Sequence, residues 1–142
     1  MGLNNISILQ VLEIYKTSVY EKDVDKFLSV YDSASRVFDT WGVWLLEGTE
    51  SRRPVIESWF GSLGQERVIV NFSDISVTES NDMAMLTAIG SYEAISIDNI
   101  ALRSMHNRFT WAMKLVEGNW KIFHEHTSVP IANDLTPKLL RD

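Results

Sequence analysis

The second half of the chain constrains the fold most, because four long segments with strand character follow one another there. They cover about 67–77, 83–97, 103–116 and 119–129, with alternating or continuous apolar residues in each. Short runs of turn residues separate them, and strands joined in this way pair with their neighbours in sequence. We therefore expect an antiparallel meander.

The strand predicted from Met83 onward has an unusual apolar pattern. Over Met83–Ile89 both alternating sets of positions carry apolar residues, whereas an antiparallel strand with one face in water alternates more cleanly. Both faces of the sheet should thus be covered, one by helices and the other most simply by a second copy of the chain. Gly90 lies in mid-strand, where a bulge or a sharp bend is the usual reason for glycine, so we expect the sheet to curve.

The first half of the chain shows helical spacing of its apolar residues instead. Three helices are predicted, with side-chain caps before the first two. Their apolar positions are Ile8, Leu12, Tyr15 and Val19 after a cap at Asn5 or Ser7; Val24, Phe27, Leu28 and Tyr31 after a cap at Asp23; and Ile56, Trp59 and Phe60 in a helix that starts at Ser51. Two short extended pieces, 36–41 and 44–47, are expected before the third helix, and the tail 130–142 should be irregular or docked along the surface.

Length and composition indicate one globular domain over residues 1–142 and exclude several classes of function. The net charge of −6 comes without a basic cluster, so the electrostatic footprint of a nucleic-acid binder is missing. There is no cysteine, which excludes a disulfide, a thiolate zinc site and a cysteine nucleophile. The sequence shows no signal-peptide pattern and no apolar run of the ~20 residues that a membrane span needs. We therefore expect a cytoplasmic protein that binds neither nucleic acid nor a membrane.

The run His124-Glu125-His126, near the end of the last predicted strand, is the strongest candidate for a functional site. Alternation places both imidazoles on one face and the carboxylate on the other. Imidazoles suit general acid–base catalysis near neutral pH; the alternative is a hydrogen-bonded pair on the sheet face or at a dimer interface. A His-x-His strand can also chelate a metal, with His106 as a third ligand. No neighbouring motif completes such a site, so we expect neither a metal nor a cofactor.

The turn around Gly118 decides which face the two histidines occupy. A three-residue loop with a bulge at Gly118 pairs His126 with Arg108 and puts both imidazoles on the face of Arg108. A two-residue loop instead puts Glu125 and Thr127 on that face. Glycine is the residue that the bulged loop requires, which favours the first arrangement.

Arg108 is a charged residue in an apolar strand. Its fork of donors could clamp a carboxylate on a ligand. The alternative is a salt bridge within the protein, to Glu125, Asp39 or Glu93.

Asp39 lies between Phe38 and Trp41. A carboxyl group against aromatic walls can have a raised pKa and can serve as a proton shuttle. The alternative is that it accepts hydrogen bonds in a cap or turn near Gly42.

The sharpest expectation is that these polar groups converge on one cavity. Asp39, His124 and His126 would supply the catalytic groups, and Arg108 would hold an anionic or carbonyl oxygen of the ligand. Aromatic residues would line the rest of the ligand site, namely Trp41, Tyr92, Tyr20 and Trp59.

Several short motifs resemble the SnoaL-like branch of the NTF2-like superfamily. They are Val37-Phe-Asp-Thr, Glu47-Gly-Thr-Glu-Ser, Arg108-Phe-Thr and Gly118-Asn-Trp-Lys-Ile-Phe-His-Glu-His-Thr-Ser. The last motif is also similar to the end of the association domain of calcium/calmodulin-dependent protein kinase II. The resemblance implies an α+β cone, with about three helices on a strongly curved, mainly antiparallel sheet. It also implies a conical pocket and homodimers packed through the outer sheet face.

The function implied by this resemblance is broad, because one fold supports many activities. The superfamily includes ketosteroid isomerases, scytalone dehydratase, polyketide cyclases, epoxide hydrolases and members without chemistry. Neither the isomerase set of a tyrosine and two acids nor the dehydratase set of Tyr, Asp and His can be placed here residue by residue. The resemblance therefore implies a cofactor-independent isomerase, cyclase or dehydratase that transfers protons on a small hydrophobic or carboxylate-bearing carbonyl compound. The alternative is a non-catalytic ligand-binding or association module.

Overall fold

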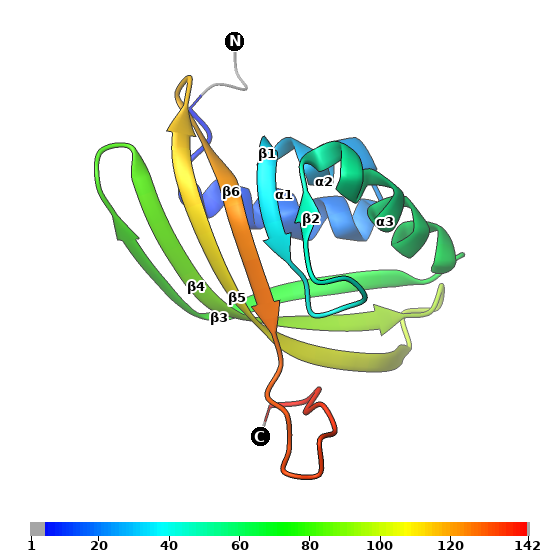
Figure 1. Ribbon diagram of the computed structural model, residues 1–142. Coiled ribbons are helices and arrows are strands. Elements are labelled where there is room, and N and C mark those ends of the chain that lie inside the picture. The colour runs from blue at the N-terminus through cyan, green and yellow to red at the C-terminus, as the bar shows by residue number, and fades with distance from the viewer. Residues whose placement is uncertain (1–4, 142) are drawn as a thin grey trace.

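The computed structural model describes residues 5–141, which form one strongly curved sheet with three helices inside its curve (Figure 1). The strand order is β2-β1-β6-β5-β4-β3. The elements are α1 (Ile8–Glu21), α2 (Val24–Ser29), β1 (Tyr31–Phe38), β2 (Leu46–Glu47), α3 (Thr49–Ser62), β3 (Arg67–Glu79), β4 (Met83–Ile95), β5 (Ala101–Val116) and β6 (Asn119–Ser128).

The expected α+β architecture is confirmed. Strands β3 to β6 pair antiparallel in sequence order, as the short connections predicted. Strand β1 lies parallel to β6, which makes the sheet mixed, and it pairs antiparallel with the short β2. Because β1 lies beside β6, the residues that follow β1 come close to the end of β6.

The first two helices begin where their caps predicted, whereas α3 begins at Thr49, before the expected Ser51. The Ser7 side chain accepts from the Gln10 backbone and forms a capping box at the start of α1. The Asp23 side chain likewise accepts from the backbone of Lys26 and starts α2. Tyr31 does not continue the apolar face of α2, as its spacing had indicated, but opens β1. Its ring still packs on Phe27, with the two ring centroids 5.5 Å apart in a stacked arrangement.

Strands β5 and β6 are joined by a two-residue turn, in which Glu117 and Gly118 have φ of 51° and 83°. Positive φ at both positions is the mark of the tight hairpin turn whose twist matches the strands. A bulge is present, but at Phe123 and not at Gly118 as expected. Phe123 is the extra residue between the pairs Met113↔Ile122 and Ala112↔His124. One extra residue reverses the faces of everything that follows it.

Gly90 does not mark the expected bulge. The pairing runs unbroken through it, with Phe72 on one side and Asn107 on the other. Its role is close packing, because a Cβ atom there would lie 2.4 Å from Cε1 of Phe109 and 2.7 Å from Oδ1 of Asn107. The irregularity lies instead in β3, between Ser73 and Ser76.

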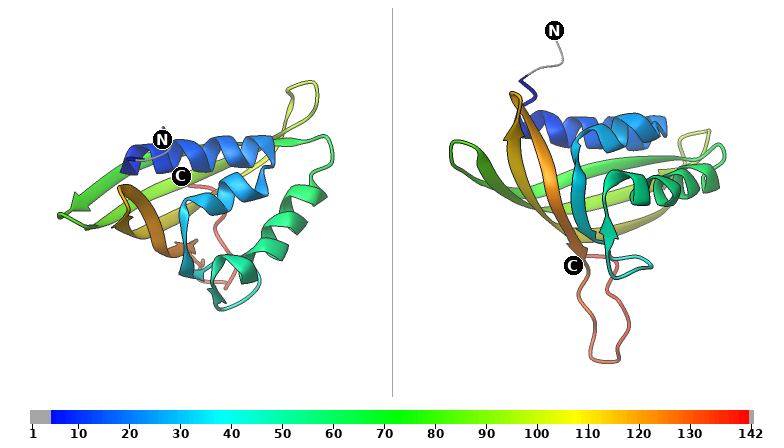
Figure 2. Two further views of the ribbon diagram at one scale, coloured as in Figure 1. Left: turned by 90° about the horizontal axis from the view of Figure 1, so that it is seen from above. Right: turned by 45° about the horizontal axis from the view of Figure 1, so that its top comes forward.

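Figure 2 shows the helices lying along the concave side of the sheet. The core fills the space between them, and aromatic rings dominate it. Trp111 of β5 and Phe27 of α2 are completely buried. The Tyr15 ring of α1 contacts four other aromatic rings, at centroid distances of 5.0 to 5.8 Å, from Phe27, Phe72, Phe109 and Trp111. In the part of the chain described, no helix is long and apolar enough to span a membrane.

The C-terminal tail docks where β6 ends. The His106 backbone N–H donates to the Leu139 carbonyl at 2.6 Å, so the tail covers the edge of β5 that β6 leaves free. A second bond runs from the Arg141 backbone N–H to Nδ1 of His106, at 2.8 Å. The docked position, one of the two expected for the tail, brings the Leu139 side chain to the cavity described below.

Candidate functional site

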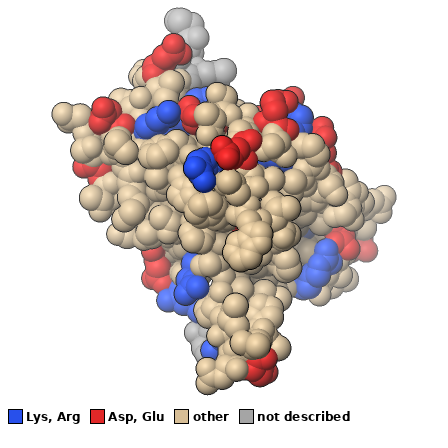
Figure 3. All heavy atoms as spheres, in the orientation of Figure 1, with Lys and Arg blue, Asp and Glu red and all other residues tan. Residues whose placement is uncertain are grey.

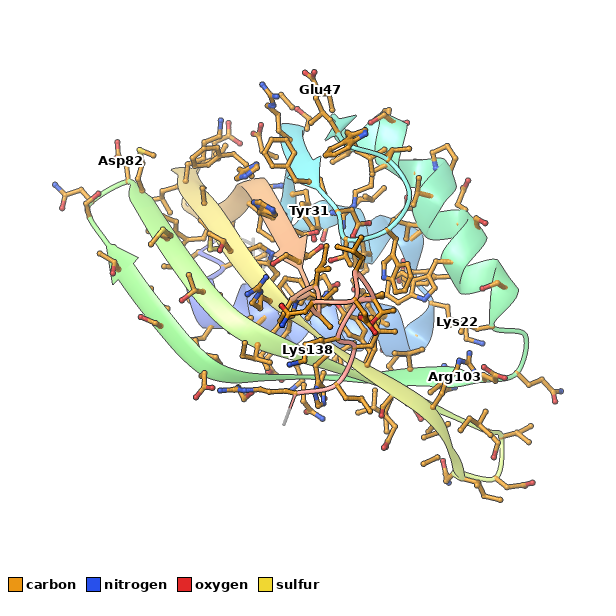
Figure 4. All side chains as sticks on the ribbon, turned by 60° about the horizontal axis from the view of Figure 1, so that its bottom comes forward. Lys22, Tyr31, Glu47, Asp82, Arg103 and Lys138 are labelled. Atoms are coloured by element: carbon orange, nitrogen blue, oxygen red, sulfur yellow. The ribbon has the colours of Figure 1, made fainter. Side chains whose placement is uncertain are left out.

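A cavity of about 650 Å³ lies between the inner face of the sheet, α3 and the tail. Most of its wall is apolar, with Trp41 in the loop after β1, Ile56 and Trp59 on α3, and Leu139 in the tail. The volume falls in the range of small-molecule sites. Figure 4 looks toward this end of the molecule, with Tyr31 in the interior between sheet and helices and Arg103 toward the rim.

The inner end of the cavity contains the carboxylate of Glu125, which is 1% exposed. Three donors from three elements converge on it: the Tyr31 hydroxyl, the Arg52 Nη2 group at 2.7 Å and the Trp111 Nε1 group at 2.9 Å. A buried charge is tolerated only when it is paired and hydrogen-bonded. Both oxygens of Glu125 are satisfied, so this carboxylate is anchored.

Arg52 completes this buried ion pair from the first turns of α3. Burial is the largest single influence and lowers the pKa of its guanidinium, but the Glu125 carboxylate, Tyr31 and Tyr15 together outweigh burial and the pKa is raised. The group therefore stays charged. It also lies over the rings of Tyr31 and Phe27, at 4.5 and 5.2 Å from their centroids, which suits a planar cation.

Asp39 is the second carboxyl group in the wall, one residue beyond the end of β1. Burial raises its pKa and the charge of Glu125 raises it further, while Arg52 and hydrogen bonds from Thr127 and the Trp41 backbone partly oppose this. The net shift is upward, in the direction that its aromatic surroundings predicted. Unlike Glu125, Asp39 has no ion-pair partner within residues 5–141.

Two tyrosine hydroxyls in the cavity wall form a pair. The hydroxyl oxygens of Tyr15 on α1 and Tyr92 on β4 are 2.7 Å apart. Burial is the largest cause that raises the pKa of both phenols, so both stay protonated. Only one of the two protons can lie between the oxygens. Asn107 also hydrogen-bonds to the Tyr92 phenol, and this bond lowers the phenol pKa, as a donor does. No side chain of the described residues accepts the second proton of the pair, so the pair can donate one hydrogen bond to a molecule in the cavity.

The sequence of residues 8–132 matches the SnoaL-like domain family. The chain belongs to this family. No curated protein matches the sequence. Solved structures show the fold of this SnoaL-like domain. One is an NTF2-like protein of unknown function from Pseudomonas putida KT2440, 18% identical, with a TM-score of 0.82 over 95% of this chain and 93% of that one.

Two further solved structures have the same fold. A proposed dehydratase of the NTF2-like family from Streptomyces avermitilis is 14% identical, with a TM-score of 0.72 over 88% of this chain and 95% of that one. A proposed association domain of a calcium/calmodulin-dependent protein kinase II from Xanthomonas campestris is 13% identical, with a TM-score of 0.68 over 85% and 84% of the two chains. At these identities the likeness establishes the cone-shaped NTF2-like fold that the sequence motifs predicted.

Four of the predicted site residues of the SnoaL-like domain do line the cavity. They are Asp39, Trp41, Trp59 and Tyr92. Their roles in chemistry or binding stay predictions.

The expected convergence of Asp39 with Arg108, His124 and His126 is wrong. These three share a face, as expected, but it is the outer face of the sheet, because the bulge at Phe123 turns Glu125 inward. Nδ1 of His124 lies 2.8 Å from the Arg36 carbonyl, and Nε of Arg108 donates to the Ser128 hydroxyl at 3.0 Å. Both imidazoles pack edge-on against Phe38. His124 therefore matches the alternative prediction, a hydrogen-bonded histidine on the sheet face.

Tyr20 also lies away from the cavity. It is near the end of α1, 41% exposed, with the Arg67 guanidinium 4.9 Å from its ring centroid. The helical spacing that places Tyr15 and Val19 in the core turns the next residue toward solvent. In the described residues, no group of three His, Asp or Glu side chains is arranged to hold a metal ion.

The sequence reasoning missed Arg52 and the inward position of Glu125. Arg52 stands next to Arg53 in a polar stretch, which is typical of a solvated helix face. One observation could have indicated the pair. When Glu125 is paired with Trp111, its carboxylate lies on a core face, where it needs a cationic partner such as an arginine.

Proposed function

We propose that this SnoaL-like domain binds a small hydrophobic carbonyl compound and transfers a proton on it without a cofactor, as an isomerase, cyclase or dehydratase does. The observation that carries the proposal is Asp39, a carboxyl group of raised pKa in the wall of a mostly apolar cavity. A carboxyl group whose pKa is raised toward working pH is suited to general acid–base catalysis. The similarity to a proposed dehydratase of the same fold is in keeping with this chemistry.

Two polar groups in the cavity wall, the Tyr15–Tyr92 pair and Asp39, suit the two halves of such a reaction. The free hydroxyl proton of the Tyr15–Tyr92 pair would donate to the carbonyl oxygen of the ligand. The carboxylate of Asp39 would remove a proton from the neighbouring carbon, and the electron pair of that C–H bond would become the enolate. A donor aimed at the developing oxyanion stabilises it. Return of the proton from Asp39 to another carbon would complete an isomerisation.

Glu125 is unsuited to the role of the base. Its two oxygens accept three hydrogen bonds and its charge is balanced by Arg52. We assign this pair to holding β1, α3, β5 and β6 around the inner end of the cavity. This leaves Asp39 as the acid–base group.

A test needs only a probe ketone. Incubation with 2-tetralone in D₂O, followed by proton NMR, measures enzyme-catalysed exchange at the carbon next to the carbonyl. We expect exchange above the buffer rate, and a loss of about 100-fold or more in Asp39→Asn, as removal of a general base costs. Asp82→Asn, at an exposed turn carboxylate, is the matched control and should exchange like the wild type.

The second candidate function is a non-catalytic ligand-binding module. The observation that favours it is that Asp39 is the one unpaired carboxyl group in the cavity wall, because Glu125 is bound in an ion pair with Arg52. Binding of 2-tetralone with no exchange that depends on Asp39 would support this reading and would overturn the catalytic one.

We further propose that the outer sheet face forms a homodimer interface. Met83 and Met85 of β4 are 52% and 51% exposed there, on the face opposite the completely buried Leu86. Such exposed apolar side chains suit burial against a second copy. Sedimentation velocity should show a dimer at micromolar concentration and a shift toward monomer in Met85→Glu. A well-behaved wild-type monomer would overturn the proposal.

A further inference from the structure

The neighbour of Asp39 on β6 is Thr127. Strands β1 and β6 run parallel, and Phe38 is paired with His126. The next residue of each strand therefore lies side by side on the inner face, which places Asp39 next to Thr127. The Thr127 hydroxyl donates to Oδ1 of Asp39 at 3.1 Å, and Thr127 is only 5% exposed.

The direction of this hydrogen bond is determined by Thr40. The Thr40 backbone N–H donates to Oγ1 of Thr127 at 2.9 Å, and the Thr40 hydroxyl donates to the same oxygen at 3.0 Å. A hydroxyl has two acceptor lone pairs and one proton. With both lone pairs of Thr127 occupied, its proton is directed to Oδ1 of Asp39. When Asp39 is ionised it cannot donate, so Thr40 donates to Thr127 and Thr127 donates to Asp39.

We propose that Thr127, held by Thr40, is the positioning residue for Asp39. It makes Oδ1 a permanent hydrogen-bond acceptor. Oδ2 has no side-chain partner among the described residues, and a carboxylate oxygen that accepts from the Trp41 backbone N–H still has a second lone pair, so Oδ2 is the oxygen that exchanges a proton with the ligand. This inference rests on the proposed acid–base function of Asp39. It adds which oxygen acts and what orients it.

Other charged and titratable groups also face Asp39, but none is bonded to it. Glu125 approaches from β6 and Arg52 from α3, and the Tyr92 phenol lies on β4. Glu125 and Arg52 are ion-paired through Nη2 of Arg52 and have opposite effects on Asp39. Of the side chains around Asp39, Thr127 is thus the one that can select between its two oxygens.

The physical consequence is a pH effect with a definite sign. A hydrogen bond donated to a carboxylate favours the ionised form. Thr127→Val keeps the shape of the side chain and removes the donor, so Asp39 should ionise at higher pH than in the wild type. Thr127→Ser keeps the hydroxyl and should restore the wild-type value. Thr110→Val, the same change on the outer face opposite His126, is the matched control.

The experiment is a titration of the Asp39 side-chain carboxyl by carbon-13 NMR in the full chain without ligand, with Asp39→Asn used to assign the resonance. We expect a higher midpoint in Thr127→Val and the wild-type midpoint in both Thr127→Ser and Thr110→Val. Thr40→Ala, which removes one of the two donors that orient Thr127, should give a smaller upward change. An unchanged midpoint in Thr127→Val, or an equal change in Thr127→Ser, would overturn the inference.

A second readout separates this inference from the proposed function. At a pH one unit below the wild-type midpoint, 2-tetralone exchange should be roughly tenfold slower in Thr127→Val, the value of one hydrogen bond to a charged group. If the wild type catalyses no exchange, the proposed function fails, while the ligand-free titration still decides whether Thr127 positions Asp39. A lower melting temperature with an unchanged midpoint would indicate a purely structural threonine.

Discussion

Both faces of β6 carry polar residues, but those on the inner face are buried and those on the outer face lie at the sheet surface. On the inner face, Glu125 and Thr127 are 1% and 5% exposed, and each is hydrogen-bonded to side chains from other elements. On the outer face, His124 and His126 pack on Phe38 at the sheet surface, and His126 is exposed. Adjacent residues of one strand thus differ completely in what a substitution should cost. Figure 3 shows one face of the molecule, on which basic and acidic side chains are interspersed and much of the surface is uncharged.

The largest difference between the faces is expected for Glu125→Ala. It leaves Arg52 buried and unpaired, which typically costs about 3–5 kcal/mol, or roughly 10 °C in melting temperature for a domain of this size. Thermal unfolding followed by circular dichroism measures this. The double variant Arg52→Met/Glu125→Leu removes both charges but leaves the Tyr31 hydroxyl and Trp111 Nε1 without an acceptor, so it should regain only part of the loss. A loss in Glu125→Ala no larger than that in His126→Ala would contradict the anchoring role.

A smaller effect is expected on β4, where the same two faces alternate. Gly90→Ala places a Cβ atom 2.4 Å from the Phe109 ring, and overpacking of this kind costs about 1–3 kcal/mol. Ser91→Ala, one residue on and on the outer face, should be nearly neutral. Urea unfolding of both variants compares them directly, and equal midpoints would show that the inner face has room to relax.

A still smaller, pH-dependent effect is expected for Asp39→Asn. The pKa of Asp39 is raised in the folded protein, so folding favours its protonated form. The stability gained from protonation is present at low pH and is lost as the pH rises through the folded pKa. Asparagine cannot ionise, so the melting temperature of the variant minus that of the wild type should increase between pH 4 and pH 8. A difference independent of pH would contradict the raised pKa.

The smallest effect is expected on the outer face. His126→Ala should change stability by less than about 0.5 kcal/mol, as exposed sites usually do, and should leave 2-tetralone exchange at the wild-type rate. His124→Ala should behave similarly, apart from its one bond to the Arg36 carbonyl. A strong loss of exchange in either variant would show that the outer face takes part in function.

Local patterns predicted most of the fold, because each element has its own periodicity. The caps Ser7 and Asp23 and the order of helices and strands could all be read from neighbouring residues. Tyr31 could not, since it follows helical spacing while its backbone pairs with Ile122 of β6. Such long-range pairing overrides a local pattern.

The candidate site was predicted only where local chemistry was sufficient. Asp39 stands out because aromatic residues flank it in sequence, and it does line the cavity. The Arg52–Glu125 pair joins residues 73 positions apart, so no spacing rule connects them. The histidines do share the face of Arg108, as predicted, but that face was expected to be the cavity side, whereas the buried Phe109 and Trp111 put the alternate positions of β5 inside.

The bulge at Phe123 determines which of two alternating sets of β6 side chains faces the cavity. If it were straightened with the tight turn kept, His124 would face Trp111 and His126 would face Phe109, on the cavity side, while Glu125 would turn outward. The segment 123–127 can thus present either the two imidazoles or the Glu125 carboxylate and the Thr127 hydroxyl to the cavity. The unpaired backbone position at Phe123 selects between them. Within such a fold, the insertion or deletion of a single residue could replace the chemistry of the cavity more completely than any substitution inside it.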